Sequence, residues 1–137
     1  MFKLNLVTPE KKLVADQDLE EIVLPAYKGE LSILPGHAPL MTTLEPGILC
    51  YKLKGQPEVK VAISWGYCQV SSEAVNVLAE SAMTASEIDL KVVQMHLKTQ
   101  EEKIATESLN DAEWADVQHE VARLKAEVLL AGGTTLN

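Results

Sequence analysis

The spacing of hydrophobic residues divides this chain into two parts. From Phe2 to about Ala82, apolar and polar residues alternate in short runs, which is the period of strands with one buried face. The alternating apolar positions are Leu4 and Leu6, Ile22 and Leu24, Val59, Val61 and Ile63, Cys68 and Val70, and Val75 and Val77. The turn formers between these runs include Pro9, Pro25, Gly29, Pro35–Gly36, Pro46–Gly47 and the segment 55–57. Roughly eight to ten short strands in such a length favour two packed antiparallel sheets or a flattened barrel.

After Ala85 the apolar residues recur at spacings of three, four and seven, which is the period of an amphipathic helix. Ser86–Asp89 is interpreted as a variant capping box that starts a helix at about residues 87–105. The apolar positions of this helix are Leu90, Val93, Leu97 and Ile104.

A second helix is predicted at about residues 111–131, where Asn110–Glu113 starts it and Gly132–Gly133 ends it. Its apolar seam is Trp114, Val117, Val121, Leu124 and Val128. Because the joint between the helices is short, they are expected to pack as antiparallel neighbours. The sequence therefore predicts an α+β fold, with an N-terminal antiparallel β-sandwich (flattened barrel) at residues 1–84 and a C-terminal antiparallel α-helical hairpin at residues 85–137.

Two Pro-Gly pairs define turns within the sandwich. In Pro35–Gly36 and Pro46–Gly47 the proline presets φ and the glycine is expected to take the positive φ of a type II turn. Pro39 forces Ala38 to be extended, so that a strand starts there or lies at an edge.

Composition excludes several classes of protein. The 137 residues suffice for one domain, or a small domain with an appendage, and the formal net charge of −8 argues against a nucleic-acid-binding surface. The N-terminus does not have the pattern of a signal peptide, and no run approaches the ~18 apolar residues of a transmembrane helix. We therefore expect a soluble, unexported chain that reaches a membrane only through partners.

Candidate chemistry is sparse. Cys50 and Cys68 are expected to be buried free thiols in a reducing compartment, and the three histidines lie on separate elements, which makes a metal site improbable. The sequence contains neither a phosphate-binding Gly-x-x-x-x-Gly-Lys-Ser/Thr loop nor a Gly-x-Ser-x-Gly elbow. The adjacent acidic pairs Glu20–Glu21 and Glu101–Glu102 are typical of a solvated face. We expect no catalytic residue, no metal and no cofactor.

One continuous segment carries a family resemblance. The stretch from Gly29 to Gly47, GELSILPGHAPLMTTLEPG, together with Ser64–Tyr67 and Val75–Ala82, resembles the epsilon subunit of bacterial F-type ATP synthases, which is called delta in mitochondria. The resemblance extends over nearly the whole chain and includes the C-terminal helical pair.

The resemblance implies a non-catalytic rotor subunit in the central stalk of a proton-translocating ATP synthase. Such a subunit couples rotation of the c-ring to the catalytic head through gamma, at the cytoplasmic face of the bacterial inner membrane and without inserting into it. The positions that match the c-ring-facing loop of the family are Lys28, Gly29, Glu30, Leu31 and Ser32. The positions that match its gamma-facing part are His37 and Thr42. Pro35–Gly36 is expected to fix the angle between these two parts, so that they form one corner.

The resemblance also implies that the hairpin can extend toward the alpha/beta head and regulate ATP hydrolysis. Some members bind ATP through an Ile/Leu-Asp-x-x-Arg-Ala motif, of which this chain keeps Ile88 and Asp89 but has Val92 and Val93 in place of Arg and Ala. Tight ATP binding is therefore not expected, since the bidentate fork of arginine is not replaced by lysine at a phosphate site and Arg123 is the only arginine of the chain.

The charge of the hairpin bears on inhibition. In inhibiting members, basic residues of the second helix meet an acidic segment of the beta subunit, whereas this chain has five basic and ten acidic residues after Ala85. Inhibition is therefore expected to be modest, with docking through Arg123 and Lys125 alone as the competing view. Two other functions are open at this stage: a free-standing nucleotide-sensing module, and a small enzyme, for which the sequence offers no nucleophile-base pair.

Overall fold

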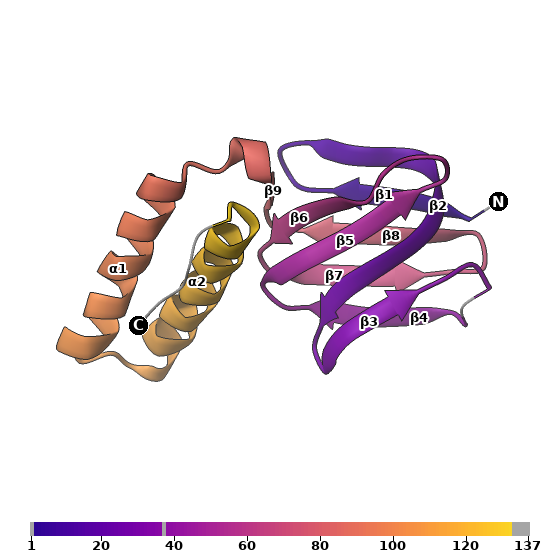
Figure 1. Ribbon diagram of the computed structural model, residues 1–137. Helices are drawn as coiled ribbons and strands as arrows, with labels where there is room; N and C mark the ends of the chain where they lie inside the picture. The colour runs from indigo at the N-terminus through magenta and orange to yellow at the C-terminus, as the bar shows by residue number, and fades with distance from the viewer. Residues whose placement is uncertain (1, 37, 133–137) are drawn as a thin grey trace.

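The computed structural model describes residues 2–36 and 38–132, which form a β-sandwich followed by two helices (Figure 1). The strands are β1 (Lys3–Val7), β2 (Lys12–Ala26), β3 (Gly29–Ile33), β4 (Leu40–Leu44), β5 (Gly47–Leu53), β6 (Val59–Ile63), β7 (Gly66–Val70), β8 (Ala74–Ala79) and β9 (Ala82–Thr84). They are followed by a short 3-10 helix η1 (Ala85–Glu87) and by α1 (Leu90–Thr106) and α2 (Asp111–Leu130). The predicted α+β fold of a sandwich and two contacting helices is confirmed.

The strands form one continuous sheet that folds into two layers, with β1, β8, β7 and β4 in one layer and β3, β2, β5, β6 and β9 in the other. The first part of β2 pairs with β1 and its second part pairs with β3 and β5, so that β2 belongs to both layers (Figure 1). The pairing is mostly antiparallel. The exception is β1, which runs parallel to β8, an arrangement that the long stretch of chain between these strands permits.

The length of β2 corrects the prediction of short strands separated at Pro25. The strand continues to Ala26, and Pro25 lies within it, opposite Glu30 of β3. Asp16 has a positive φ of 51°, and the register shifts in the pairing of β2 with β1 and with β5. Such bulges bend a strand, and here they allow β2 to pass from one layer to the other without a turn residue that the sequence could reveal.

The core of the sandwich is made by the alternating apolar residues. Most of the predicted positions are buried: Leu4, Leu6, Ile22, Leu24, Val61, Ile63, Cys68, Val70, Val75 and Val77. In most strands the neighbours of these residues are less buried, as expected for sheets with one buried face, but in β6 Ala62 is buried as well.

The first helix begins later than the predicted residue 87. Its N-cap is Asp89, whose Oδ1 accepts a hydrogen bond from the Val92 N–H at 3.3 Å. The predicted cap at Ser86 is wrong, because this residue lies in η1, where Thr84 and Glu87 form the capping box. In the second helix, the side chain of Asn110 accepts from the Glu113 N–H at 2.8 Å.

The helices pack on each other through a separate apolar cluster. Its buried members are Val93, Leu97, Val117, Val121, Leu124 and Val128. Trp114 does not belong to this seam as predicted, since it is 46% exposed, and Ile104 and Leu109 pack at that end of the hairpin instead. The second helix contacts β5 and β6, and it lies between α1 and the sandwich (Figure 1).

Candidate functional site

The expected c-ring-facing segment forms a β-hairpin rather than a loop. Ala26 of β2 pairs with Gly29 of β3, so that only Tyr27 and Lys28 form the turn. Both turn residues are exposed, and the Tyr27 side chain is 67% exposed. The hairpin therefore presents an aromatic ring and a positive charge at its tip, and sequence reasoning had not selected Tyr27.

The other predicted residues of this segment lie in β3. Glu30 and Ser32 are exposed on the outer side of the strand, and Ser32 Oγ donates to Glu21 Oε2 at 3.2 Å. Leu31 is half-buried and packs against the core. Regular strand pairing holds Glu30 in a fixed orientation, which a free loop would not do.

The Pro35–Gly36 turn lies at the other end of β3 from this tip. Gly36 has a φ of 89°, as expected for the glycine of a type II turn, and both residues are exposed. Since a strand rises about 3.3 Å per residue, the five residues of β3 separate the two turns by roughly 15 Å. The expectation of one corner is therefore corrected: the segment has two turns at opposite ends of a strand. His37 lies outside the described residues.

At Pro46–Gly47 the predicted positive φ is wrong. Gly47 begins β5, pairs with Ile63, and is not among the described glycines with positive φ. A Cβ at this position would lie 2.8 Å from the Pro25 Cβ, so that a glycine is required here by close packing rather than by backbone conformation.

Thr42, the other predicted gamma contact, lies in the middle of β4. It is half-buried, on the same side of the strand as the buried Leu44, and its hydroxyl donates to the Thr43 carbonyl at 3.3 Å. The outward-facing residues of β4 are its neighbours Met41, which is 66% exposed, and Thr43.

Met41 and Thr43 continue into an uncharged surface on the outer side of the β4, β7, β8 and β1 layer, bordered by Lys3 at the start of β1, which pairs with Asp18 at 2.6 Å. Thr43 is opposite Tyr67, Tyr67 is opposite Leu78, and Leu78 is opposite Val7. We call this surface the outer sheet face, and its residues are Met41, Thr43, Tyr67, Gln69, Asn76, Leu78, Asn5 and Val7.

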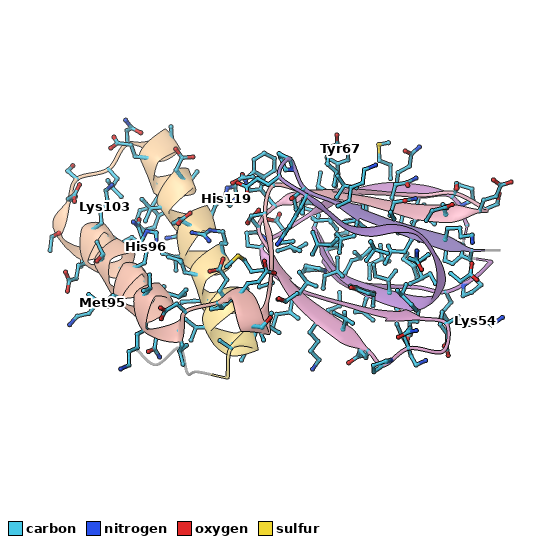
Figure 2. All side chains as sticks on the ribbon, turned by 90° about the horizontal axis from the view of Figure 1, so that it is seen from above. Lys54, Tyr67, Met95, His96, Lys103 and His119 are labelled. Atoms are coloured by element: carbon cyan, nitrogen blue, oxygen red, sulfur yellow. The ribbon has the colours of Figure 1, made fainter. Side chains whose placement is uncertain are left out.

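The outer sheet face is amphipathic and shallow. Tyr67 and Leu78 are 48% and 39% exposed, and a hollow of about 260 Å³ lies between β1, β7 and β8. Figure 2 shows Tyr67 pointing away from the sandwich, on a side that the helices do not cover. The sequence signal for this surface was the presence of Tyr67 and Leu78 at positions that alternation assigns to solvent.

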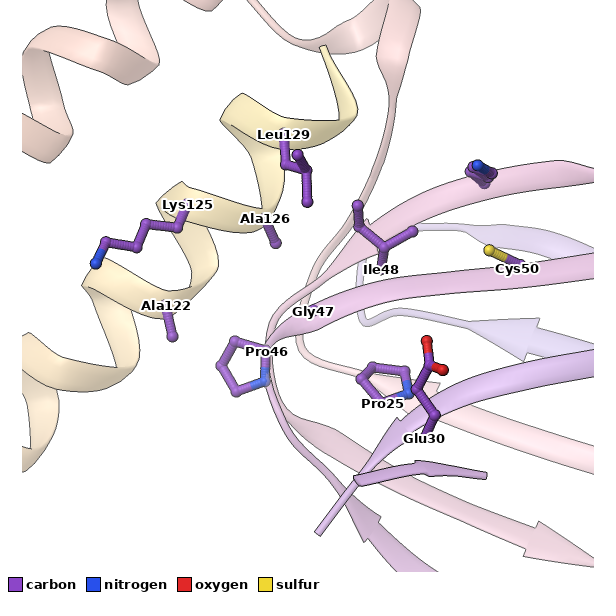
Figure 3. A pocket seen from close by; sticks show the side chains of 11 residues that line it. Pro25, Glu30, Pro46, Gly47, Ile48, Cys50, Ala122, Lys125, Ala126 and Leu129 are labelled. Atoms are coloured by element: carbon purple, nitrogen blue, oxygen red, sulfur yellow. The ribbon is translucent and has the colours of Figure 1, made fainter. Parts of the chain in front are cut away.

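A groove of about 520 Å³ separates α2 from the other layer (Figure 3). The helix side is lined by Ala122, Lys125, Ala126 and Leu129, and the sandwich side by Pro25, Glu30, Pro46, Gly47, Ile48, Cys50 and Lys60. Small side chains face the sandwich here, which leaves the groove incompletely filled. Cys50, at the floor of the groove, and Cys68, in the core, are free thiols, and burial raises the pKa of Cys68 to about 12.

The residues retained from the ATP motif have structural contacts in this chain. Ile88 packs against the hairpin core, and the carboxylate of Asp89 caps α1. Val92, at the position of the motif's arginine, is 60% exposed. The geometry thus offers no positive charge at this position for a phosphate group.

The only arginine of the chain is paired within α2. Arg123 donates from Nη1 to Glu127 Oε2 at 2.6 Å, and from its Nε and Nη2 atoms to Glu120. Glu127 is 3% exposed, and burial raises its pKa although Arg123 acts in the opposite direction. In the described arrangement the Arg123 guanidinium is thus already engaged by two carboxylates.

Within residues 2–36 and 38–132 no three His, Cys, Asp or Glu side chains gather in a way that could hold a metal ion. Over the same residues, no helix combines the length and the apolar composition that crossing a membrane requires.

Residues 1–85 match the sequence profile described as ATP synthase, Delta/Epsilon chain, beta-sandwich domain. This chain belongs to the ATP synthase delta/epsilon family. It is 50% identical to the ATP synthase epsilon chain of Bdellovibrio bacteriovorus, over 93% of this chain and 91% of that one. It is 38% identical to the epsilon chain of Geobacter sulfurreducens, over 96% of this chain and 94% of that one. The predicted family and the prediction of a non-catalytic ATP synthase subunit are thus confirmed.

Two solved assemblies contain chains of similar structure. A chain in the mitochondrial ATP synthase of Euglena gracilis, solved as OSCP/F1/c-ring, superposes with a TM-score of 0.76 and 25% identity, covering 93% of this chain and 78% of that chain. A chain in the central stalk/c-ring structure of the Tetrahymena thermophila mitochondrial ATP synthase superposes with a TM-score of 0.66 and 16% identity. The match covers 95% of this chain and 96% of that chain. The second likeness supports the delta/epsilon fold alone.

Proposed function

We propose that this epsilon-type chain is a rotor subunit of the central stalk in a proton-translocating F-type ATP synthase, at the cytoplasmic face of a bacterial inner membrane. It couples rotation of the c-ring to the catalytic head through gamma. The identity of half of the residues with a bacterial epsilon chain supports this role, as do the assemblies in which chains of similar structure were solved.

The observation that carries the proposal is the outer sheet face, on which gamma docks. The chain has 23% charged residues, yet the eight residues of this face carry no formal charge and include exposed Met41, Tyr67 and Leu78. Lys3, which borders the face on β1, is paired with Asp18 at 2.6 Å. Interface cores are depleted in charge and enriched in aromatic residues and methionine. The face also includes β4, so that it continues from the strand in which Thr42 lies and which follows His37 in the sequence.

The c-ring contact is made by the β2–β3 hairpin, through Lys28, Gly29, Glu30, Leu31 and Ser32, with Tyr27 added at the tip. The pairing from Ala26–Gly29 to Ile22–Ile33 ties this hairpin into the sandwich. A hairpin that is paired along its length transmits a lateral force with little bending, which suits contact with a rotating ring.

The helical hairpin is proposed to regulate ATP hydrolysis by leaving the sandwich and reaching the alpha/beta head. The incompletely filled groove between α2 and the sandwich supports a docked position that can be released. Arg123 is already paired with Glu120 and Glu127, and acidic residues outnumber basic ones in the hairpin. Both features support a weak rather than a strong inhibitory contact.

Co-purification tests the function as a whole. A tagged chain isolated from its native membranes is expected to bring gamma, the c-ring and the alpha/beta head, identified by mass spectrometry, in amounts that match an assembled enzyme. Recovery of the chain alone from freshly solubilised membranes, with the intact synthase in the unbound fraction, would contradict the rotor role.

A further inference from the structure

The connector between the sandwich and the hairpin is held by one carboxylate. Glu87, the last residue of η1, accepts at Oε1 from the N–H and the hydroxyl of Thr84, at 3.0 and 2.9 Å. Its other oxygen, Oε2, lies 2.5 Å from the Lys11 Nζ. One side chain thus joins the connector to two parts of the sandwich that are far apart in the sequence.

Both partners of Glu87 are themselves fixed. Thr84 is the last residue of β9 and is paired with Val61 of β6. Lys11 lies in the turn before β2, where its N–H donates to the hydroxyl of the buried Thr8 at 3.2 Å and its carbonyl accepts from the Thr8 N–H at 2.8 Å. The carboxylate therefore binds to Thr84 on a paired strand, and to a lysine side chain whose backbone is held by Thr8.

Glu87 lies directly before the hairpin in the chain, where the path of the backbone affects the direction of α1. Only Ile88 separates it from Asp89, the N-cap of α1, and Ile88 is itself extended and packed against the hairpin core. The path of the connector at Glu87 therefore sets the direction in which α1 leaves the sandwich. The other contact of the hairpin, between α2 and the sandwich, is incompletely filled at the groove.

We propose that Lys11, Thr84 and Glu87 form an ionic clasp that holds the hairpin in its docked position, and that loss of the Lys11–Glu87 pair increases the undocked population. The clasp deepens the proposed regulation of ATP hydrolysis. Only its effect in the assembled complex rests on the proposed function, because docking of the hairpin is a property of the isolated chain. The pairing also lowers the pKa of Glu87 to about 2, chiefly through Lys11 and then Thr84, so that the carboxylate is ionised at neutral pH.

The solvent exposure of Lys11 and Glu87 determines how large a change in the undocked population we expect. The side chains of Lys11 and Glu87 are 42% and 38% exposed, and ion pairs of this kind are weak and sensitive to salt. We therefore expect the undocked population to rise about two- to fivefold when the pair is removed, with the sandwich remaining folded.

The test measures the distance between the two units in the full chain. Spin labels are placed at Gln69 on the outer sheet face and at Lys98 on α1, in a background with Cys50→Ser and Cys68→Ala. The distance between the labels, measured by pulsed electron paramagnetic resonance, reports the docked and undocked populations. Samples are equilibrated at the temperature at which about a tenth of the parent molecules populate the longer distance, where a few-fold change is visible, and are then frozen rapidly for the measurement. If no second population exists below the unfolding transition, the hairpin does not detach and the proposal is overturned.

Lys11→Met and Glu87→Gln each remove one charge and keep most of the side-chain shape, and Gln at residue 87 can still accept from Thr84. Each variant is expected to raise the longer-distance population two- to fivefold, and the double variant no further, because the pair is broken only once. Lys12→Met, which removes the same charge one residue away, is the matched control and is expected to change nothing. Equal populations in the parent, Lys11→Met and Glu87→Gln would overturn the clasp.

A salt series in the parent chain needs no substitution in the clasp. Between about 10 mM and about 1 M NaCl the Debye length falls from about 30 Å to about 3 Å, so that the longer-distance population is expected to rise in the parent and to stay constant in Glu87→Gln. A constant population in the parent would also overturn the clasp. Gamma binding by the same variants is measured separately, and its loss would count against the proposed gamma site on the outer sheet face and not against the clasp.

Discussion

The side-chain oxygen of Asn5 accepts a hydrogen bond from the backbone N–H of Asp16 at 2.8 Å. Asp16 has the positive φ that accompanies the bend of β2 between the two layers, and the amide nitrogen of Asn5 donates to Asn76 Oδ1 at 3.0 Å. Asn5 therefore links three strands at the point where the sheet folds over.

Replacement of Asn5 by alanine is expected to lower the free energy of unfolding by about 1 kcal/mol, because the Asp16 N–H loses its acceptor where the backbone is least favourable. Urea denaturation of the chain measures this change. Asn76→Ala removes only the side-chain contact and is expected to cost less. A larger loss in Asn76→Ala than in Asn5→Ala would show that the bend does not depend on Asn5.

A charge on the outer sheet face is expected to weaken gamma binding. Tyr67→Glu places a carboxylate at the centre of an uncharged surface, and burial of an unpaired charge in an interface should reduce affinity at least tenfold, or about 1.4 kcal/mol. Affinity of the purified chain for gamma is the measurement. Tyr27→Glu, the same substitution at the hairpin tip, serves as the control and should leave gamma affinity unchanged while reducing ATP-driven proton pumping in vesicles. Loss of gamma affinity in Tyr27→Glu alone would move the gamma site to the hairpin tip, where the Tyr27 N–H donates to the Thr43 carbonyl at the edge of the outer sheet face, at 3.2 Å.

ATP is expected to bind weakly or not at all. Isothermal calorimetry with the purified chain should detect no binding at micromolar concentrations, since a phosphate at the Val92 position would lack a charge-assisted hydrogen bond worth about 1.5–3 kcal/mol. Val92→Arg supplies this charge at an exposed position and should leave stability nearly unchanged. Micromolar affinity in the unmodified chain would contradict this prediction.

Glu127 is expected to make stability fall as pH rises. Its pKa is raised above 4.5 in the folded chain because of burial, so that the folded state holds its proton more tightly than the unfolded state does. Below the pKa of Glu127 in the unfolded chain, about 4.5, the side chain is protonated in both states and costs no stability. As the pH rises, the free energy of unfolding falls, until the pH passes the raised pKa of the folded chain. The difference in unfolding free energy between Glu127→Gln and the parent should therefore shift in favour of the variant as the pH rises above about 4.5. A shift in the opposite direction would mean that Arg123 dominates over burial.

Removal of the hairpin is expected to raise ATP hydrolysis by less than tenfold. The truncated chain, ending at Ala85, should still bind gamma, since the outer sheet face lies wholly within the strands. Hydrolysis by the assembled complex at low salt, with and without residues 86–137, gives the ratio. An increase of tenfold or more would mean that the hairpin is a strong brake despite its negative charge.

Alternation predicted the core because each strand buries one face, and Leu4, Leu6, Ile22 and Leu24 are all fully buried. The same reasoning could not reveal β2 as one strand, because its bend is made by Asp16 and the hydrogen bond from Asn5 rather than by a glycine or proline. Local patterns do not encode such long-range contacts.

The starts of the helices and the residues of the candidate site could not be predicted in full, for other reasons. Ser86 and Asp89 are both good cap residues, but Ser86 lies within the short helix η1 that Thr84 and Glu87 cap, and Glu87 also contacts Lys11, which lies 76 positions earlier in the sequence. The motif that identified the family pointed to Thr42, whereas the residues of β4 that face outward are Met41 and Thr43. A family motif marks a segment, and only the pleat of the strand decides which of its side chains reach a partner.

The membership of β2 in both layers has a mechanical consequence. Hydrogen bonds between antiparallel strands lie across the strand direction, so that a pull along β2 loads many of them together, in shear, instead of opening them one after another. A push on the tip at Tyr27 and Lys28 enters β2 at its C-terminal end and is shared with β5 in one layer and β1 in the other. The sandwich should therefore resist torque as a single stiff body, and forced-unfolding experiments that pull along β2 should require more force than those that peel β3 away from its edge.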